Sequence, residues 1–278
     1  SWFATVLEDR VPESRQFRPR AIVDEFQRSL RMETDFSAEL ASMVRFRRNF
    51  LDEPDLHIPV PREDLSTRRV LVMEQVDGIK VTDRDELIAA GIDLRRIIDN
   101  GMRLTLRSIF EFGFFHADPH PGNFFVQRDG RIALLDFGMM GSIEPRRVDE
   151  MLAFMVSLLT ADLDRMIDLL LEADLIGDET DMRAMRSDLG CLLQRYQAAS
   201  LQSVDVSQFV AEVSSVAIRH HVMLPSDLLL VGKAMATMEG IALELVPDFR
   251  PLEAIRPYLT EVYLRRMLDA KRHSQVAV

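Results

Sequence analysis

A short hairpin pattern near the middle of the chain constrains the fold more than any other feature. Phe124–Gln127 and Ile132–Leu135 are apolar segments of strand length, and the Asp129-Gly130 pair between them is typical of a tight turn. Outside this hairpin, apolar residues recur mainly at helical spacing, as they do over Asp93–Phe112. The pattern therefore predicts an α+β fold in which helix dominates and a small sheet interrupts it.

The remaining segments extend this interpretation to both ends of the chain. Apolar spacing predicts helices over Ile22–Leu30 and Phe36–Val44. His57–Val60 and Val70–Glu74 are short apolar segments typical of strands. Everything after Pro145 has a helical pattern, so a helical bundle should follow the sheet. Interruptions of this bundle are expected near Gly177, Ser203, Pro225 and Pro247–Pro251.

Composition and charge exclude several classes of partner and site. The formal net charge is -11, so the chain lacks the excess of Lys and Arg with which proteins bind nucleic-acid phosphates. A single cysteine, Cys191, excludes an internal disulfide and a cysteine-based zinc cluster, and we expect it in the core. No apolar run reaches the 18 residues of a membrane span. Because the chain starts at Ser1 without a signal pattern, we expect a fragment.

Polar residues with a fixed spacing surround the hairpin. Asp118, in the His116-Ala117-Asp118 step, is followed five residues later by Asn123, and Asp136-Phe137-Gly138 comes directly after the second strand. This order and spacing match the catalytic loop and the metal-binding motif of protein kinases. Since the hairpin runs out from Asn123 and returns at Asp136, both side chains should meet there and supply oxygen ligands for Mg²⁺. Asp118 is then the candidate general base.

Each of these residues also has a purely structural interpretation, because single aspartates commonly cap helices or turns. The complete set in order is much harder to explain in that way. His116 and His120 are not interpreted as a metal pair, since Pro119 and Pro121 place them in a loop rather than on one helix face. His116 is expected to scaffold that loop.

A second, weaker pattern lies upstream of the long helix. Met73, Glu74 and Val76 resemble the hinge of a kinase, in which backbone groups around Glu74 and Val76 bind adenine and Met73 is the gatekeeper. A strand that ends in a turn has the same appearance. The position before the helix that leads to His116 favours the hinge.

Four strings together resemble the AarF/UbiB family of atypical kinases, which is associated with ubiquinone biosynthesis. They are METDFSAE at 32–39, HADPHPGN at 116–123, LLDFGMMG at 134–141 and LPSDLLLVGKAMATMEG at Leu224–Gly240. The resemblance implies that Glu33 and Asp35 form the family's Glu-x-Asp signature and belong, with His120, to the nucleotide site. It also implies that Glu39 is the helix glutamate that pairs with a nucleotide-binding lysine. From the residues alone, acids near a helix start simply favour the helix dipole.

The resemblance implies a protein-kinase-like fold, with a partial N-lobe over residues 1–76 and a helical C-lobe over residues 77–278. It implies ATP and Mg²⁺ as cofactors of a kinase-like ATPase that acts in, or regulates, ubiquinone biosynthesis. Ser42 departs from the family, which usually has Asn there. The family's alanine-rich loop and Lys-x-Gly-Gln motif are not found, and no lysine precedes Lys80, so Glu39 has no lysine partner in the sequence before it. We therefore expect residues 1–278 alone to be nearly inactive.

Two other functions remain open. An aminoglycoside- or choline-type phosphotransferase also has a histidine two residues after the catalytic aspartate, as His120 is here, but such enzymes rarely keep Asp-Phe-Gly. A nucleotide-binding pseudokinase regulator would have no need of Asp118. A general protein kinase is disfavoured because no Ala-Pro-Glu follows Asp136.

Location and lipid partners are further implications of the resemblance. It implies a cytoplasmic protein, peripheral to the inner membrane in a bacterium and organellar in a eukaryote. The partner is then a quinone-like lipid or the membrane surface. The basic end of the chain around Arg265 and Arg266, next to Tyr258, is compatible with contact to anionic lipid and equally with a solvated helix end. Nothing in the sequence indicates an oligomeric state.

Overall fold

The computed structural model describes residues 35–177, 179–198 and 206–276. The helix predicted over Ile22–Leu30 and the signature residue Glu33 lie outside these ranges. The helices of the described residues are α3 (Phe36–Asn49), α4 (Arg84–Ala89), α5 (Leu94–Phe110), α6 (Pro145–Leu159), α7 (Leu163–Glu172), α8 (Met182–Ala198), α9 (Val206–Arg219), α10 (Ser226–Leu245) and α11 (Pro251–Val276). The structure confirms a helix-dominant α+β fold.

A four-stranded sheet holds the hairpin. Its strands are β1 (Leu56–His57), β2 (Ile79–Lys80), β4 (Phe124–Val126) and β5 (Ile132–Leu134), in the order β1-β5-β4-β2. β4 and β5 pair antiparallel, with Phe124 opposite Leu134, so the hairpin prediction is confirmed. Gly130 has a φ of +85° in the turn, a conformation that glycine adopts without strain.

A second, two-stranded sheet joins β3 (Phe114–His116) to β6 (Met140–Ser142), which the sequence did not predict. Three residues are too few to show a periodicity of two. Gly141 in β6 faces the buried ring of Phe115 so closely that a Cβ would lie 2.5 Å from its Cζ atom. Only glycine therefore lets these strands approach, and their pairing ties the segment before Asp118 to the segment after Asp136.

The strands predicted near the N-terminal end were only partly correct. β1 stops at His57, because Pro59 and Pro61 have no N–H groups with which to continue a ladder. Val70–Glu74 forms no continuous strand; it makes two isolated bridges, from Met73 to Pro61 and from Val70 to Thr67.

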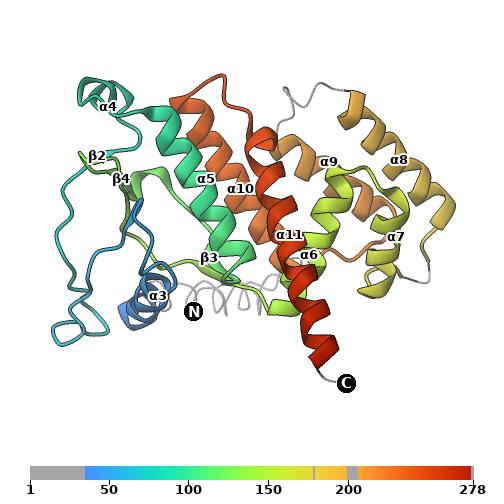
Figure 1. Cartoon of the computed structure of the whole chain (residues 1–278), viewed down its shortest axis with the longest axis horizontal. Helices are drawn as coiled ribbons and strands as arrows, with labels where there is room; N and C mark the ends of the chain where they lie inside the picture. The colour runs from blue at the N-terminus through green and yellow to red at the C-terminus, as the bar shows by residue number, and fades with distance from the viewer. Residues whose placement is uncertain (1–34, 178, 199–205, 277–278) are drawn as a thin grey trace, which may run out of the picture.

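Figure 1 shows how the elements are arranged. The sheet with α3 and α4 lies at one end, the long helices α5, α10 and α11 lie in the middle, and α7, α8 and α9 lie at the other end. The main core forms where α5 packs against α10 and α11, and it includes the fully buried Ile109, Ala234 and Leu259. Met43 and Phe46 of α3 join the same core, which fixes α3 against the region of the β4–β5 hairpin.

A smaller core connects α7, α8 and α9. Met185 and Leu192 of α8 are completely buried in it. Cys191 lies on the exposed side of the same helix, so the expectation of a buried cysteine was wrong. Its neighbours Leu189 and Leu192 occupy the inward positions of that turn.

The last helix, α11, packs its basic residues onto the molecule itself. The hydroxyl of Tyr258 donates a hydrogen bond to Glu111 Oε1 at 3.1 Å, and Arg265 pairs with the same carboxylate at 3.3 Å. Arg266 forms an ion pair with Asp149. These two arginines are thus bound to carboxylates of the protein. Among the helices within the described ranges, none combines the length and hydrophobicity needed to cross a membrane.

Candidate functional site

The two predicted metal ligands meet at the open end of the hairpin. The Nδ2 group of Asn123 donates a hydrogen bond to Asp136 Oδ2 at 2.8 Å. The backbone N–H of Leu135 donates to the carbonyl of Asn123 at 3.1 Å, so the hairpin itself sets this contact. The other oxygen of Asp136, Oδ1, accepts from the N–H of Gly138 at 2.8 Å. Both side chains are partly exposed. The expected meeting of the two residues is found, and their role as ligands stays a prediction.

The loop between β3 and β4 carries Asp118 in a chain of local hydrogen bonds. The N–H of Asp118 donates to His116 Nδ1 at 3.2 Å, and its carbonyl accepts from the N–H of His120 at 2.7 Å. His120 Nδ1 in turn accepts from the N–H of Gly122 at 3.1 Å and caps the 3-10 turn η2 (Pro121–Asn123). His120 therefore positions Asn123 through the backbone, since the N–H of Asn123 donates to the carbonyl of His120 at 3.0 Å.

His116 is the buried anchor of this loop. It is 7% exposed, and burial lowers its pKa, with the nearby carboxylates of Asp136 and Asp118 only partly opposing that effect. A neutral imidazole at neutral pH is able to accept the hydrogen bond from Asp118 through Nδ1. This geometry fits the scaffolding role expected from the sequence.

Glu39 on α3 reaches the Asp-Phe-Gly segment. Its Oε1 accepts a hydrogen bond from the backbone N–H of Phe137 at 3.2 Å. Burial raises the pKa of Glu39, and the negative charge of Asp136 adds to the increase. The ring of Phe137 is fully buried and lies 5.6 Å from that of Phe46. The sequence offered no lysine for Glu39, and the structure gives it this backbone donor instead.

Asp35 occupies the N-cap of α3 rather than a position beside Asp136. Its Oδ1 accepts from the N–H of Ser37 at 3.1 Å, and its other carboxylate oxygen pairs with Arg68 Nε at 2.9 Å. The hydrogen bond from Ser37 is the main reason that the pKa of Asp35 is lowered. The described residues thus show Asp35 in the capping role that its position at a helix start favours.

The candidate hinge residues contact the neighbouring segment. The N–H of Glu74 donates to the carbonyl of Val60 at 2.9 Å, and Glu74 Oε2 accepts from the N–H of Val60 at 3.0 Å. Glu74 Oε1 lies 3.4 Å from His57 Nε2. Met73 is partly buried against the core, and Val76 is half-buried. The amide of Glu74 is therefore already used, and the adenine assignment stays a prediction.

The sequence missed Lys233, which contacts the candidate base. Its Nζ lies 3.1 Å from Asp118 Oδ1 and comes from α10, far along the chain. The Leu224–Gly240 string contained this lysine, but no local pattern links that string to the catalytic loop. Only the packing of α10 against α5 and β6 brings it there.

The donor set suits magnesium when nucleotide supplies the remaining ligands. Asp136 provides a carboxylate, and the amide oxygen of Asn123 is left over because its Nδ2 group donates to Asp136. Within the described ranges, no group of three His, Cys, Asp or Glu residues is arranged to hold a metal. Mg²⁺ is typically bound by one or two protein oxygens together with phosphate oxygens and water. Asn123 and Asp136 fit that mode.

Comparisons with known proteins cover almost the whole chain. Residues 1–170 match the ABC1 atypical kinase-like domain, and residues 190–250 match the UbiB helical domain. The chloroplastic protein ACTIVITY OF BC1 COMPLEX KINASE 1 of Arabidopsis thaliana is 32% identical over 92% of this chain and 38% of its own length. An uncharacterized protein of Synechocystis is 31% identical, over 91% of this chain and 37% of its own length. The probable protein kinase UbiB of Shewanella piezotolerans is 27% identical over 93% of this chain and 48% of its own length.

The chain therefore spans less than half the length of these relatives. Among solved structures, Rv3197 of Mycobacterium tuberculosis, determined with erythromycin, has the same fold. The TM-score is 0.60 at 21% identity, and the match covers 87% of this chain and 63% of that one.

Proposed function

Because the chain belongs to the ABC1/UbiB family of atypical kinase-like proteins, we propose that it binds MgATP at Asn123 and Asp136 and transfers or hydrolyses the terminal phosphoryl group. One observation carries the proposal: the two side chains are joined by a 2.8 Å hydrogen bond at the open end of the hairpin that the catalytic loop enters. A kinase-like class is shown by the family, and the cofactor and the reaction are the proposal.

Each residue has a separate role in this mechanism. Asn123 and Asp136 hold the metal, which when bound neutralises charge on the ATP phosphates. Asp118 accepts the proton of an attacking hydroxyl group or water. The attacking oxygen then bonds to the γ-phosphorus, the bond from that phosphorus to the β–γ bridging oxygen breaks, and ADP leaves with that electron pair. His116 and His120 keep Asp118 and Asn123 in place through the backbone.

We assign residues 1–76 to the N-lobe side and residues 77–278 to the C-lobe side of this site. Adenine would then lie near Met73, Glu74 and Val76. In this proposal Glu33 and Asp35 belong to the nucleotide site. Asp35 caps α3, which carries Glu39 to Phe137, and Glu33 lies outside the described residues.

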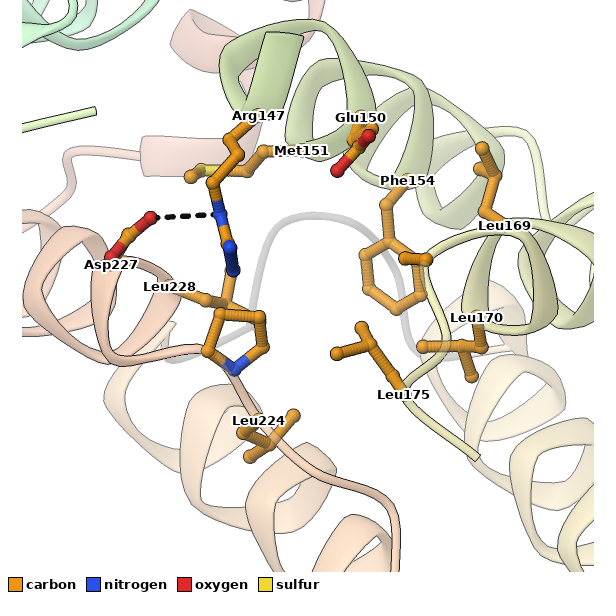
Figure 2. Close-up of a pocket in the computed structure, with 12 residues that line it drawn as sticks. Arg147, Glu150, Met151, Phe154, Leu169, Leu170, Leu175, Leu224, Asp227 and Leu228 are labelled. Atoms are coloured by element: carbon orange, nitrogen blue, oxygen red, sulfur yellow. Dashed lines mark ion pairs between the residues drawn. The ribbon is translucent and has the colours of Figure 1, made fainter. Parts of the chain in front are cut away.

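An apolar cavity supports a lipid-like ligand (Figure 2). It has a cavity volume of about 100 Å³, is partly open, and lies between α6, α7 and the start of α10. Its apolar lining includes Met151, Phe154, Leu169, Leu170, Leu175, Leu224 and Leu228. At one side Arg147 Nε pairs with Asp227 Oδ2 at 3.1 Å, as Figure 2 shows. An apolar tail with a polar ring at the Arg147 end matches this distribution, so we propose a quinone-like lipid as the ligand.

The cavity proposal is tested by direct binding. Phe154→Gln should weaken binding of a short-chain quinone analogue by roughly tenfold, because a polar amide replaces the partly buried ring. Leu264→Gln is the matched control, since Leu264 is exposed on α11 and does not line the cavity. Equal affinities of wild type and Phe154→Gln would show that the quinone does not bind there.

Substrate class is tested on the natural full-length protein. We expect ATP hydrolysis that responds to vesicles containing a quinone-like compound, with little phosphate transfer to generic proteins. Robust phosphorylation of an aminoglycoside, detected by mass spectrometry, would instead favour the phosphotransferase function. MgATP binding without any turnover would favour a pseudokinase regulator.

A further inference from the structure

One ion pair connects the two halves of the chain at the candidate base. Lys233 Nζ lies 3.1 Å from Asp118 Oδ1, and both side chains are about half exposed, at 50% and 46%. Asp118 belongs to the part that matches the ABC1 domain, and Lys233 to the part that matches the UbiB helical domain. The helical domain thus contributes a charged group directly to the catalytic loop.

The position of Lys233 is set by a rigid helix. Its neighbours Val231, Ala234 and Met235 are buried in the main core, so α10 has little freedom to rotate. On α5, Gly101 has no side chain, so Met238 of α10 packs closely there. Its Cε atom lies 3.2 Å from the position that a Cβ at Gly101 would occupy. With the buried face fixed in this way, Lys233 is held on the side that faces Asp118.

The catalytic segment has no nearby cation of its own. Between Phe114 and Gly141 the basic residues other than histidine are Arg128 and Arg131, both at the turn end of the hairpin, and Arg131 pairs with Asp129. The opposite end carries Asp118, Asp136 and, from α3, the carboxylate of Glu39. Lys233 supplies positive charge where the mechanism gathers carboxylates and phosphates.

The residue type is informative as well. The chain has 34 basic residues, of which only three are lysines: Lys80, Lys233 and Lys271. An ammonium group has three donors on a compact head, so it is able to hold a carboxylate and a phosphate oxygen at the same time. In the structure, the ammonium group of Lys233 contacts the carboxylate of Asp118.

We propose that Lys233 is a positioning residue for phosphoryl transfer, an inference that rests on the proposed function. Its ammonium group fixes the carboxylate of Asp118 toward the attacking group, so Lys233 acts on the reaction through Asp118. The alternative is an ordinary surface ion pair. Such pairs contribute little to stability, and their loss leaves activity unchanged.

A double-mutant cycle separates these alternatives in the full-length protein. Lys233→Met should lower kcat for ATP hydrolysis by roughly 10²-fold, as the loss of one charge-stabilising group commonly does, while KM for ATP changes less than about threefold. Lys233→Arg should recover part of the rate. In an Asp118→Asn background, Lys233→Met should change kcat by less than about threefold, because its partner is already removed. Lys80→Met is the control, as it makes the same change on an exposed strand residue.

A wild-type kcat in Lys233→Met, or equal losses in both backgrounds, would overturn the proposal. A second measurement does not need turnover: lysine side-chain NMR, in which the Lys233 signal is the one missing from Lys233→Arg. We expect that signal to shift on Asp118→Asn and on addition of MgATP. If wild type hydrolyses no ATP, the proposed function fails, and an unchanged Lys233 signal with MgATP independently rules out the role of Lys233.

Discussion

The carboxylate of Glu39 accepts a hydrogen bond from the backbone N–H of Phe137, although 98 residues separate them. The contact joins helix α3 to the Asp-Phe-Gly segment directly after Asp136. It leaves the carboxylate half-buried and close to a second negative charge, which together raise its pKa. The hydrogen bond from Phe137 itself lowers the pKa, so it partly offsets the effects of burial and of Asp136 on this carboxylate.

Substitutions of Asp136 and Asp118 should affect different properties, the first MgATP binding and the second ATP turnover. Asp136→Asn removes the negative charge of the proposed metal ligand, so MgATP affinity should fall. Asp118→Asn should leave affinity nearly unchanged and lower ATP turnover by roughly 10²–10⁴-fold, since general-base catalysis contributes that much. Calorimetry and a phosphate-release assay on the full-length protein measure the two effects. Equal MgATP affinity for wild type and Asp136→Asn would contradict the metal assignment.

Replacing Glu39 should show opposite effects of charge and hydrogen bonding. The pKa of Glu39 is higher in the folded protein than its unfolded value of 4.5. The contribution of Glu39 to the free energy of unfolding is therefore lost as pH rises from that unfolded value through the folded one. Glu39→Gln keeps an acceptor for Phe137, so its stability relative to wild type should rise between pH 4 and pH 7. Glu39→Ala removes the acceptor and should cost about 1 kcal/mol. Thermal unfolding at both pH values tests this. A wild type that becomes more stable relative to Glu39→Gln as pH increases would refute it.

A buried carboxylate joins the N-terminal segment to α5. Glu53 has a side chain that is 4% exposed and accepts hydrogen bonds from Arg103 at 2.8 and 2.9 Å, and it also pairs with Arg107. Because the arginines are partly exposed, Glu53→Gln should lower the free energy of unfolding by about 2–3 kcal/mol, less than a fully buried pair would. Glu150→Gln, in an exposed pair with Arg146, should cost less than about 1 kcal/mol.

The Glu53 effect should depend on pH. The bonds from Arg103 lower the pKa of Glu53, so its contribution is present above the unfolded value of 4.5 and is lost as pH falls through the folded value. The difference between wild type and Glu53→Gln should therefore narrow below pH 4.5. A difference that stays constant through that range would mean that ionisation of Glu53 does not stabilise the fold.

Gly141→Ala should destabilise the sheet of β3 and β6. The added methyl group would lie 2.5 Å from Phe115 Cζ, and that ring is fully buried and cannot move away. Overpacking of this kind should cost about 1–3 kcal/mol. Gly240→Ala on α10 is the control, because nothing lies within 4 Å of its Cβ position and the change should stabilise by roughly 0.5–1 kcal/mol. Chemical denaturation compares the two, and a neutral Gly141→Ala would disprove the close packing.

The parts of the fold that could be predicted are those with local patterns. The hairpin turn at Gly130 and the approach of Asn123 to Asp136 both follow from residues within one short segment. β3 and β6 could not be predicted, because strands of three residues show no period and depend on the packing of Gly141 against Phe115. Lys233 was missed for a related reason: its contact with Asp118 exists only after α10 has packed.

The direct path from Asp136 to α6 has a consequence for control of the protein. α6 begins at Pro145, nine residues after Asp136, and β6 holds three of the residues between them in a sheet. In protein kinases the corresponding segment is long, and its phosphorylation switches the site on. In this chain β6 pairs with β3 and so holds part of that segment in a sheet. α10 both carries Lys233 and borders the apolar cavity, so we expect a ligand bound there to affect the candidate site through this helix.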